Sequence, residues 1–412
     1  VATLYNWENE FKINAPEKVQ AEVQVVYGAK KDRLKAINSG KKILITNPEA
    51  LQMPDVVKAI ADKGIYSLVI DECHKFKDHK AKRFKTISML SKMARQKILM
   101  TGTPILNSYL DLWAQFYLLD GGETLGNNYF VFRNEYFEDK NLAWAGKENY
   151  FPNFQPKPDI DKILSEKIER KSSRITKDEC LDLPPQVFET MHVELSIEQQ
   201  KAYDEMLDEM VTMLKEGTCA APNALTRVLR LLQILSGHLE VENDLGEKHV
   251  KNFDNTPRIK LLKELLEELT PRSKVIVWCT FSKNYSAIRK LCTDLNLEYA
   301  ELTGETKNRQ EQIDKFNNDE RCRVMISNPQ AGGVGVNLVS SDVAIYYSRS
   351  FSLGDRLQSE ARNHRGGSEI HKSITVIDIV AKNTIDEDVL GALQRKETYS
   401  DNVLDKLKEK YL

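Results

Sequence analysis

The sequence predicts an α/β protein with two parallel sheets, because short apolar runs alternate with helical patterns in its first and last thirds. The runs lie at 42–46, 66–70 and 97–100, and again at 274–278, 323–326, 343–347 and 373–380. Each run is apolar at nearly every position, as is typical of strands in a parallel sheet whose two faces are covered by helices. Each block is therefore expected to form a doubly wound sheet.

The residues between these blocks differ in character and are expected to be mostly helical. Amphipathic helical patterns cover 198–215 and 225–235, whereas 240–257 is polar and loop-like. The stretch 129–154 is rich in Tyr and Phe. We interpret it as the packed core of a helical insertion, and a surface that stacks on nucleic-acid bases is the alternative. The expected division is a first lobe at 1–120, a helical insertion with linker at 121–255, and a second lobe at 256–412.

The composition excludes several classes of protein. Lys and Arg total 59 against 61 for Asp and Glu, so the formal net charge of -2 indicates no nucleic-acid partner, and any such site must be local. The six cysteines include no Cys-x-x-Cys pair, which argues against a zinc ribbon and favours a reducing compartment. No apolar run approaches the ~18 residues of a membrane span. We expect a cytoplasmic, monomeric protein without a membrane partner.

Two adjacent carboxylates, Asp71 and Glu72 of Asp-Glu-Cys-His, directly follow the second apolar run. Ligands of open α/β sheets bind at the carboxyl ends of the strands. In nucleotide hydrolysis, one carboxylate holds Mg²⁺ beside the phosphates, and another orients and deprotonates the attacking water. We assign the metal to Asp71 and the water to Glu72. The alternative is an ordinary acidic helix cap.

A turn of small and hydroxyl-bearing residues, Thr101-Gly102-Thr103-Pro104, follows the third apolar run. Gly102 allows the backbone to turn sharply, and the two threonine hydroxyls can bond a carboxylate or a phosphate. Alone, the string predicts only a turn. Because it follows Asp-Glu-Cys-His in the chain, the string indicates a functional site more specifically than it does alone.

Two strings in the last third suit an anionic ligand. The string 331–338 has three glycines in four positions, which permits close approach of the backbone to an anionic group. Arg362 and Arg365 are three positions apart, a spacing that predicts one helix face and a clamp for an oxyanion. The alternatives are a flexible turn for the first string and a salt-bridged surface helix for the second.

These four strings occur in a fixed order on two similar blocks, and in that order the chain resembles the Swi/Snf-type DNA-dependent ATPases of helicase superfamily two. Asp71–His74 resembles their second motif, 101–107 the third, 331–338 the fifth and 358–365 the sixth. Further similarity lies at 4–11 (motif Ia), 45–51 (motif Ib), 183–186, 302–304 with Arg309 and Phe316 (motif IVa), and 384–387. The resemblance covers about residues 4–396 and implies two RecA-like lobes.

The resemblance implies an ATP-dependent double-stranded DNA translocase or helicase-like motor that hydrolyses Mg²⁺-bound ATP at the cleft between the lobes. It implies that Arg362 and Arg365 act as arginine fingers and that His74 couples the nucleotide site to the third motif. The other residues it implies in nucleotide binding are Thr101, Gly102, Thr103, Gly333, Gly335, Asn337 and Gln358. The residues it implies in DNA binding, mainly through their backbone, are Thr46, Thr280, Thr303 and Gly304.

The sequence departs from the family pattern in two places. No Gly-x-Gly-Lys-Thr/Ser phosphate loop occurs, and the nearest string, 39–42, lacks the hydroxyl residue and leads into a strand. We interpret this as an amino-terminal truncation, with natural loss of the ATPase as the alternative. We therefore expect weak or no ATP turnover from residues 1–412 alone. In the sixth motif, Ala361 replaces a common Asp, and 366–368 replaces Ile-Gly-Gln.

Two other functions stay open. One is a strand-separating superfamily-two helicase, and the other is a non-hydrolysing DNA-binding or regulatory protein that kept the fold and lost its phosphate loop. The compact lobes resemble phage and bacterial members, so a nucleoid-associated location or a phage-infected cell is expected.

Residues 71–97 carry nine Lys or Arg against three Asp or Glu. We interpret this run as a solvated helix face, with a DNA-binding surface as the alternative.

Overall fold

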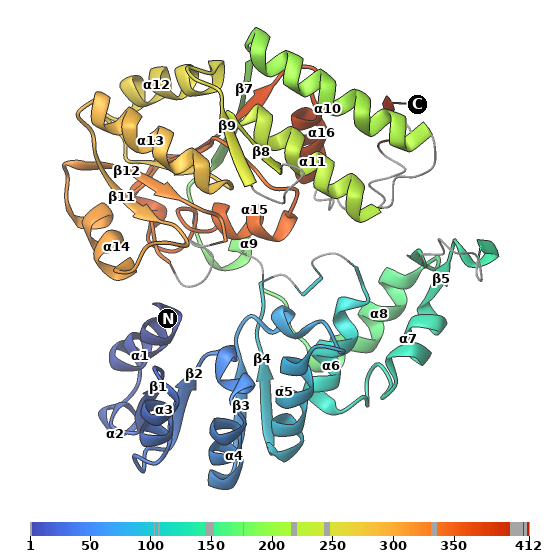
Figure 1. Ribbon diagram of the computed structural model, residues 1–412. Helices are drawn as coiled ribbons and strands as arrows, with labels where there is room; N and C mark the ends of the chain where they lie inside the picture. Colours follow the sequence, from blue (N-terminus) through green and yellow to red (C-terminus); the bar gives the residue numbers. More distant parts are fainter. Residues whose placement is uncertain are drawn as a thin grey trace. The chain divides into compact units, whose positions relative to one another are not determined.

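The computed structural model describes residues 2–102, 104–105, 108–144, 152–175, 177–215, 221–242, 248–330, 336–395, 407 and 410–411. The chain divides into two compact units, unit 1 at 3–175 and unit 2 at 176–412, which are described separately (Figure 1). The sequence predicted three segments. The predicted middle segment is shared between the units, because its first helices pack into the core of unit 1 and its later helices into that of unit 2.

Unit 1 contains two pairs of parallel strands. β1 (Val23–Val26) pairs with β2 (Ile43–Thr46), and β3 (Ser67–Ile70) pairs with β4 (Gln96–Leu99). The three apolar runs predicted in this block are thus strands, and their parallel direction is as predicted. Within the described ranges each of these strands has a single partner. The side chains of Val69 and Ile98 stay 51% and 55% exposed, so the predicted burial of both sheet faces is wrong for β3 and β4 among the described residues.

The helices of unit 1 lie beside these strands and beyond them. Their bounds are α1 (Ala2–Asn14), α2 (Glu17–Gln20), α3 (Lys30–Ile37), α4 (Pro54–Lys63), α5 (Lys82–Met93), α6 (Asp111–Asp120), α7 (Tyr129–Tyr136) and α8 (Ile160–Ile168). A short antiparallel pair, β5 (Phe137–Asp139) and β6 (Phe154–Pro156), follows α7.

The main core of unit 1 is rich in aromatic side chains. Phe84 of α5 and Trp113 of α6 are each 5% exposed, and both belong to the same cluster. The aromatic stretch adds Phe132, Tyr136 and Phe137 to it, so the predicted packing is confirmed for these three side chains. Residues 145–151 of that stretch lie outside the described residues.

The turn after α6 requires glycine at one of its two glycine positions. Gly122 has a φ of +101°, and a Cβ atom there would lie 2.6 Å from the Cα atom of Asn127. Gly121 also has a positive φ, +73°, but a Cβ atom there meets nothing within 4 Å.

We therefore expect Gly122→Ala to lower the free energy of unfolding of unit 1 by more than ~3 kcal/mol, because a backbone clash adds to the strained φ. Gly121→Ala, with the strain alone, should cost about 1 kcal/mol. Urea unfolding followed by tryptophan fluorescence measures both. Equal losses would contradict this account of the turn.

Unit 2 is built on a six-stranded sheet with the strand order β11-β12-β10-β13-β14-β7 (Figure 1). Every neighbouring pair is parallel. The strands are β7 (Gln186–Val193), β10 (Val275–Trp278), β11 (Glu298–Leu302), β12 (Cys322–Ser327), β13 (Val343–Tyr346) and β14 (Ile374–Ala381). The four strands predicted from apolar runs in this block are confirmed as β10, β12, β13 and β14.

Alternate side chains of this sheet enter two cores, one on each face. Val275 and Val277 of β10 belong to one hydrophobic cluster, whereas Ile276 and Trp278 belong to another. Residues of α12 and α13 complete the first cluster, and residues of α14 complete the second. Because both faces are covered, the sheet is doubly wound, and the predicted α/β fold class is confirmed.

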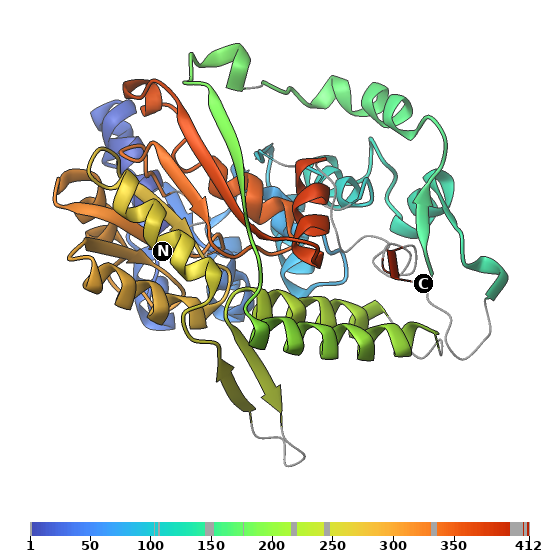
Figure 2. The same cartoon turned by 90° about the horizontal axis from the view of Figure 1, so that it is seen from above.

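The helices of unit 2 include a long pair beside the sheet. Their bounds are α9 (Lys177–Cys180), α10 (Ile197–Lys215), α11 (Ala221–Leu235), α12 (Pro257–Leu269), α13 (Ser282–Asp294), α14 (Arg309–Asn318), α15 (Leu353–Glu360) and α16 (Ile385–Gln394). Figure 2 shows α10 and α11 side by side, and they confirm the two predicted amphipathic helices.

The segment 240–257 was expected to be a loop, and this was wrong. β8 (His238–Glu242) and β9 (Lys248–Asn252) form an antiparallel hairpin. Leu239, Val241 and Val250 alternate with polar residues there, a period that signals a strand but is too short to stand out from the surrounding charge.

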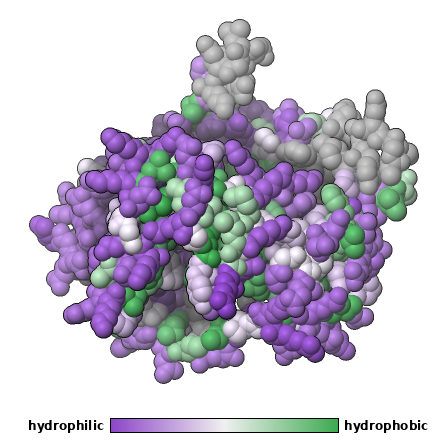
Figure 3. All heavy atoms as spheres, turned by 90° about the horizontal axis from the view of Figure 1, so that it is seen from below, coloured by the Kyte–Doolittle hydropathy of each residue, from purple (hydrophilic) through white to green (hydrophobic). Residues whose placement is uncertain are grey.

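The described surface is largely polar. Figure 3 shows one face of the molecule, on which hydrophilic side chains predominate and hydrophobic ones gather in small groups. Among the helices of the described ranges, none combines the length and the apolar character that a bilayer crossing requires.

Candidate functional site

The acidic pair of unit 1 lies in the turn that leaves β3. Glu72 has a left-handed backbone, with φ 50° and ψ 49°, a conformation that non-glycine residues rarely adopt outside functional turns. The backbone N–H of Glu72 donates to Asp71 Oδ1 at 2.8 Å, and Trp7 Nε1 donates to Asp71 Oδ2 at 3.2 Å. Asp71 is exposed, so its carboxylate can accept further bonds.

His74 joins this turn to the end of β4. Its side chain is buried, and Nδ1 lies 2.9 Å from Thr101 Oγ1 and 3.2 Å from Glu72 Oε2. The backbone N–H of Cys73 donates to Met100 O at 3.0 Å. The structure thus brings together Glu72, His74 and Thr101, three of the predicted site residues.

The rest of the third motif is only partly described. Gly102 is exposed, and nothing lies within 4 Å of a Cβ atom built there. Thr103 and Asn107 lie outside the described residues.

Gln115 of α6 contacts both the second and the third motif, and sequence reasoning missed it. Its side chain is buried; Oε1 accepts a hydrogen bond from Cys73 Sγ at 3.2 Å, and Nε2 donates to Pro104 O at 2.6 Å. Burial, with help from Glu72, raises the pKa of Cys73 to about 12, so the thiol keeps the proton that it donates. A single Gln inside an apolar helix is the signal that could have identified it.

The carboxylate chemistry of unit 1 fits a magnesium ion that is held mainly by phosphates and water. Within the described ranges, no group of three or more His, Cys, Asp or Glu side chains is placed to hold a metal by itself. Mg²⁺ at nucleotide sites usually keeps several waters and takes only one or two carboxylates from the protein. Asp71, an exposed single carboxylate, suits that role.

In unit 2, the two predicted arginines converge on one carbonyl oxygen, that of Val336. Arg362 Nη1 donates to it at 3.5 Å and Arg365 Nη1 at 3.4 Å. The backbone N–H of Leu338 donates in turn to Arg362 O at 3.0 Å. Val336 belongs to the string 331–338 and directly follows its last glycine, so the fifth and sixth motifs are in contact. Gly333 and Gly335 of that string lie outside the described residues.

The two arginines do not share a helix face, so the spacing argument was wrong. α15 ends at Glu360, and residues 361–367 form turns. The carbonyl of Arg362 bonds to Leu338 rather than to the next helical turn, which explains why the helix stops.

The fifth and sixth motifs contain two more predicted site residues that the structure describes, Asn337 and Gln358. Gln358 is a half-buried residue of α15. Asn337 is exposed, and its carbonyl accepts a bond from Asn317 Nδ2 at 2.9 Å.

A buried ion pair fixes α15 to the sheet. Arg356 binds Asp378 of β14 through two bonds, Nη1 to Oδ1 at 2.6 Å and Nη2 to Oδ2 at 2.9 Å. The guanidinium carbon of Arg356 lies 3.7 Å from the ring centre of Tyr346, whose hydroxyl bonds Ser359 at 2.6 Å. The segment that carries Arg362 is therefore attached to a strand and not only to its own helix.

The same network extends to α16. Arg349 binds Asp378 at 3.2 Å and also binds Asp386, which Arg258 contacts as well. Burial alone would raise the pKa of Asp386, but the two guanidinium groups outweigh it and hold that pKa below its ordinary value. Sequence reasoning missed this network, although an Asp inside the apolar run 373–380 was its visible sign.

We expect Arg356→Gln to lower the free energy of unfolding of unit 2 by about 3–5 kcal/mol, because it leaves Asp378 buried without its two-bond partner. Arg365→Gln should cost less than about 1 kcal/mol, since that half-buried side chain has, within the described ranges, a single long bond to a carbonyl. Urea unfolding measured by circular dichroism compares the two variants. Similar losses would contradict the distinction.

Two of the four predicted DNA-binding residues line a pocket of about 580 Å³ at the carboxyl edge of the unit 2 sheet. Thr280 follows β10, and its hydroxyl donates to Ser348 O at 3.3 Å. Gly304 follows β11 and is exposed. Parallel α/β sheets bind ligands at this edge.

The other two predicted DNA-binding residues use their hydroxyls within the fold. Thr303 is 0% exposed, its Oγ1 lies 3.2 Å from Thr306 Oγ1, and its backbone N–H donates to the same oxygen at 2.9 Å, so Thr303 itself is not accessible to a ligand. In unit 1, the hydroxyl of Thr46 donates to Val26 O at 3.1 Å at the end of β2.

His238, at the start of β8, lines the same pocket as Thr280. It is 2% exposed, and its Nδ1 lies 3.2 Å from Ser236 Oγ. Burial lowers the pKa of His238 to about 4, and the charges of Lys283 and Arg230 add to this effect against that of Glu240. The imidazole is therefore neutral at physiological pH.

This pKa predicts a pH dependence of stability. Below pH ~6.5 the unfolded chain takes up a proton on His238 that the folded chain refuses until about pH 4. Stability should therefore fall by about 2 kcal/mol between pH 7.5 and pH 5 through this group. In urea unfolding, His238→Gln should remove this part of the fall in the free energy of unfolding. His192→Gln changes an exposed histidine of β7 and should leave the fall unchanged. Identical pH profiles for all three proteins would refute it.

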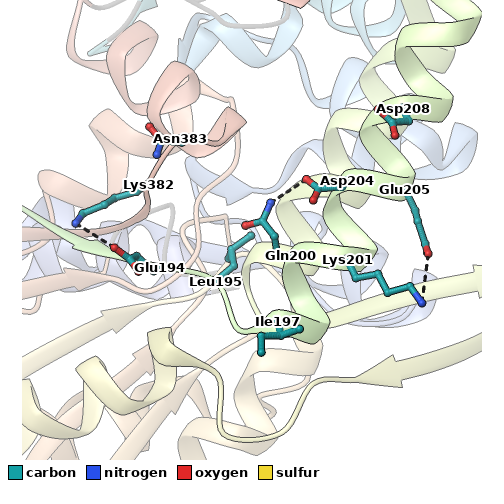
Figure 4. Close-up of a pocket in the computed structure, with 10 residues that line it drawn as sticks. All are labelled: Glu194, Leu195, Ile197, Gln200, Lys201, Asp204, Glu205, Asp208, Lys382 and Asn383. Atoms are coloured by element: carbon teal, nitrogen blue, oxygen red, sulfur yellow. Dashed lines mark hydrogen bonds and ion pairs between the residues drawn. The ribbon is translucent and has the colours of Figure 1, made fainter.

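A second pocket of unit 2, of about 800 Å³, lies beside α10 and contains none of the predicted site residues (Figure 4). Several of its polar groups contact one another: Lys382 lies 3.7 Å from Glu194, and Gln200 donates to Asp204 at 2.8 Å. Both contacts are drawn in Figure 4.

Family comparison agrees with this arrangement of motifs. The sequence model of the SNF2-related domain matches residues 1–242, and that of the helicase conserved C-terminal domain matches residues 257–367. The chain belongs to the SNF2-related family.

Several relatives of this SNF2-related chain are much longer proteins. An uncharacterized ATP-dependent helicase of Mycoplasma genitalium is 29% identical over 405 residues, which is 96% of this chain and 36% of that protein. The CHD3-type chromatin-remodeling factor PICKLE of Arabidopsis thaliana is 25% identical over 99% of this chain and 30% of its own length. This SNF2-related chain thus spans about a third of the length of the curated relatives it matches.

Among solved structures, the SWI2/SNF2 ATPase core of Sulfolobus solfataricus in complex with dsDNA is similar to this chain. It shows 22% identity, with 98% of this chain and 81% of that chain covered and a TM-score of 0.43.

Proposed function

We propose that this SNF2-related chain is part of an ATP-driven motor that moves along double-stranded DNA. The observation that carries the proposal is the convergence of Arg362 and Arg365 on Val336 O, beside the glycine-rich string. Among the described residues, no carboxylate forms an ion pair with Arg365, whose contact with Val336 is to a neutral oxygen. Its guanidinium group can therefore bind an anion such as a phosphate.

The acidic turn of unit 1 supplies the complementary chemistry in this proposal. Asp71 would hold Mg²⁺, which neutralises phosphate charge when it is bound. Glu72, fixed by its left-handed backbone and by its contact with His74, would orient and deprotonate the attacking water. His74 and Thr101 would transmit the state of this turn to the third motif.

Arg362 and Arg365 would act on the phosphoryl group that is transferred. Guanidinium groups stabilise the charge that builds on the transferred phosphoryl group, and removal of such a finger lowers turnover by on the order of a thousandfold or more. The buried Arg356–Asp378 pair would keep the segment that bears them in place.

DNA contact in this proposal comes from the turns after β10 and β11, where Thr280 and Gly304 line one pocket. These contacts would reach the sugar-phosphate backbone and would read little sequence. Binding should therefore weaken steeply as salt rises. Movement along DNA follows if the affinity of these turns for DNA changes as ATP is hydrolysed.

We expect Arg365→Ala to lower DNA-stimulated ATP turnover about a thousandfold while the affinity for ATP changes little. The assay needs the protein as its gene encodes it, because residues 1–412 contain no phosphate-loop string. Turnover is measured by phosphate release, and affinity by equilibrium binding of a fluorescent ATP analogue.

Arg272→Ala is the matched control, since Arg272 is an exposed arginine of the same unit outside the motifs. It should leave turnover unchanged. Turnover by the Arg365 variant close to that of the unaltered protein would refute the finger assignment.

A further inference from the structure

α5 of unit 1 begins in a group of exposed cations. Lys80 in the preceding turn, together with Lys82, Arg83 and Lys85 in the first turn of the helix, forms what we call the α5 basic patch. All four side chains are exposed. Among the residues that the structure describes, none of the four forms an ion pair with a carboxylate.

The surroundings of the patch do not neutralise it. Residues 71–97 carry nine Lys or Arg against three Asp or Glu, and two of these acids belong to the acidic pair of the second motif. The third, Asp78, accepts the backbone N–H of Lys80 at 2.9 Å and so closes the turn. Of the two acids of α6, Asp111 pairs with Lys77 at 3.1 Å and Asp120 with Lys171 at 3.2 Å.

The placement of these cations is unfavourable for the fold itself. The first turn of α5 has no acidic residue, and its cap residue, Ala81, offers no side-chain hydrogen bond. Positive side chains at the positive end of a helix dipole destabilise the helix. Lys82 and Lys85 also lie three positions apart, where like charges repel. A cluster that lowers the stability of its own helix calls for an explanation outside the fold.

We propose that the α5 basic patch binds the phosphate backbone of double-stranded DNA, as a contact separate from the motif turns. The inference rests on the proposed function, which makes DNA the track. A polyanion compensates both the mutual repulsion of the cations and the helix dipole, and it releases counterions as it binds.

The chemistry of the patch favours a nucleic acid over an acidic protein segment. Ala81 is the one small apolar residue at its surface, and Phe84, between Arg83 and Lys85, is 5% exposed and points into the core. Protein interfaces rely on apolar or aromatic anchors at their centre, which this patch does not offer. Phosphate contacts need only charge and hydrogen-bond donors.

The test compares the unaltered chain with the variant Lys82→Gln/Arg83→Gln/Lys85→Gln. Binding to a fluorescein-labelled DNA duplex of mixed sequence is measured by anisotropy over a range of salt concentrations. Loss of three phosphate contacts should reduce the slope of log affinity against log salt by about 2–3 and weaken binding at low salt by at least about tenfold. The same variant should unfold at a higher temperature, because the repulsion is removed.

The matched control is Lys31→Gln/Lys35→Gln, two exposed lysines of α3 in the same unit with no ion pair among the described residues. It should change neither the salt slope nor the binding at low salt. Poly-glutamate serves as a second probe. If the patch variant loses affinity for poly-glutamate but not for the duplex, the proposal is overturned and the partner is an acidic protein.

The remaining outcomes separate this inference from the proposed function. Normal duplex binding by the unaltered chain with an unchanged salt slope in the patch variant overturns the patch alone. No duplex binding by the unaltered chain overturns the DNA part of the proposed function and the patch with it. The effect of Arg365→Ala on ATP turnover does not involve the patch.

Discussion

One carbonyl oxygen, that of Val336, fixes the chemistry of unit 2. It accepts bonds from both Arg362 and Arg365, and it belongs to the residue that directly follows Gly335, the last glycine of the string 331–338. This neutral acceptor orients the guanidinium group of Arg365 without cancelling its charge, and no carboxylate of the described residues pairs with Arg365. The proposed action on a phosphate depends on that charge.

The arginines that do meet carboxylates have the opposite role. Arg356, Arg349 and Arg258 are buried with Asp378 and Asp386, and they connect α15, β14, α16 and α12. Unit 1 is arranged in a similar way. Gln115, buried in α6, bonds Cys73 and Pro104, while Asp71 and Glu72 lie in the turn that directly precedes Cys73. In both units, a buried polar anchor lies next to a group that is accessible to a ligand: Asp71 is exposed and Arg365 is half-buried, whereas Arg362 is itself only 7% exposed.

Much of this arrangement could be predicted from local sequence. Continuous apolar runs identified the strands, and in unit 2 the reason is that the strands are buried on both faces, whereas Val69 in unit 1 stays exposed. The motif order identified His74 with Thr101 and the two arginines. The predicted arginine helix was wrong because helical spacing holds only while the helix continues, and the bond from Leu338 to Arg362 ends it. Gln115 and Asp378 were missed because their partners are 42 and 22 residues away, and no local pattern reports such a contact.

The central claim is that Arg365 stabilises the transferring phosphoryl group and not the bound ATP. The most direct measurement compares, in the DNA-bound protein as its gene encodes it, the affinities for Mg²⁺·ADP·aluminium fluoride and for a slowly hydrolysed ATP analogue. A group that acts in the transition state contributes to the first affinity and little to the second. We expect Arg365→Ala to weaken the first by about a hundredfold or more, with the second within about threefold. Equal weakening of both, or of neither, would contradict the account.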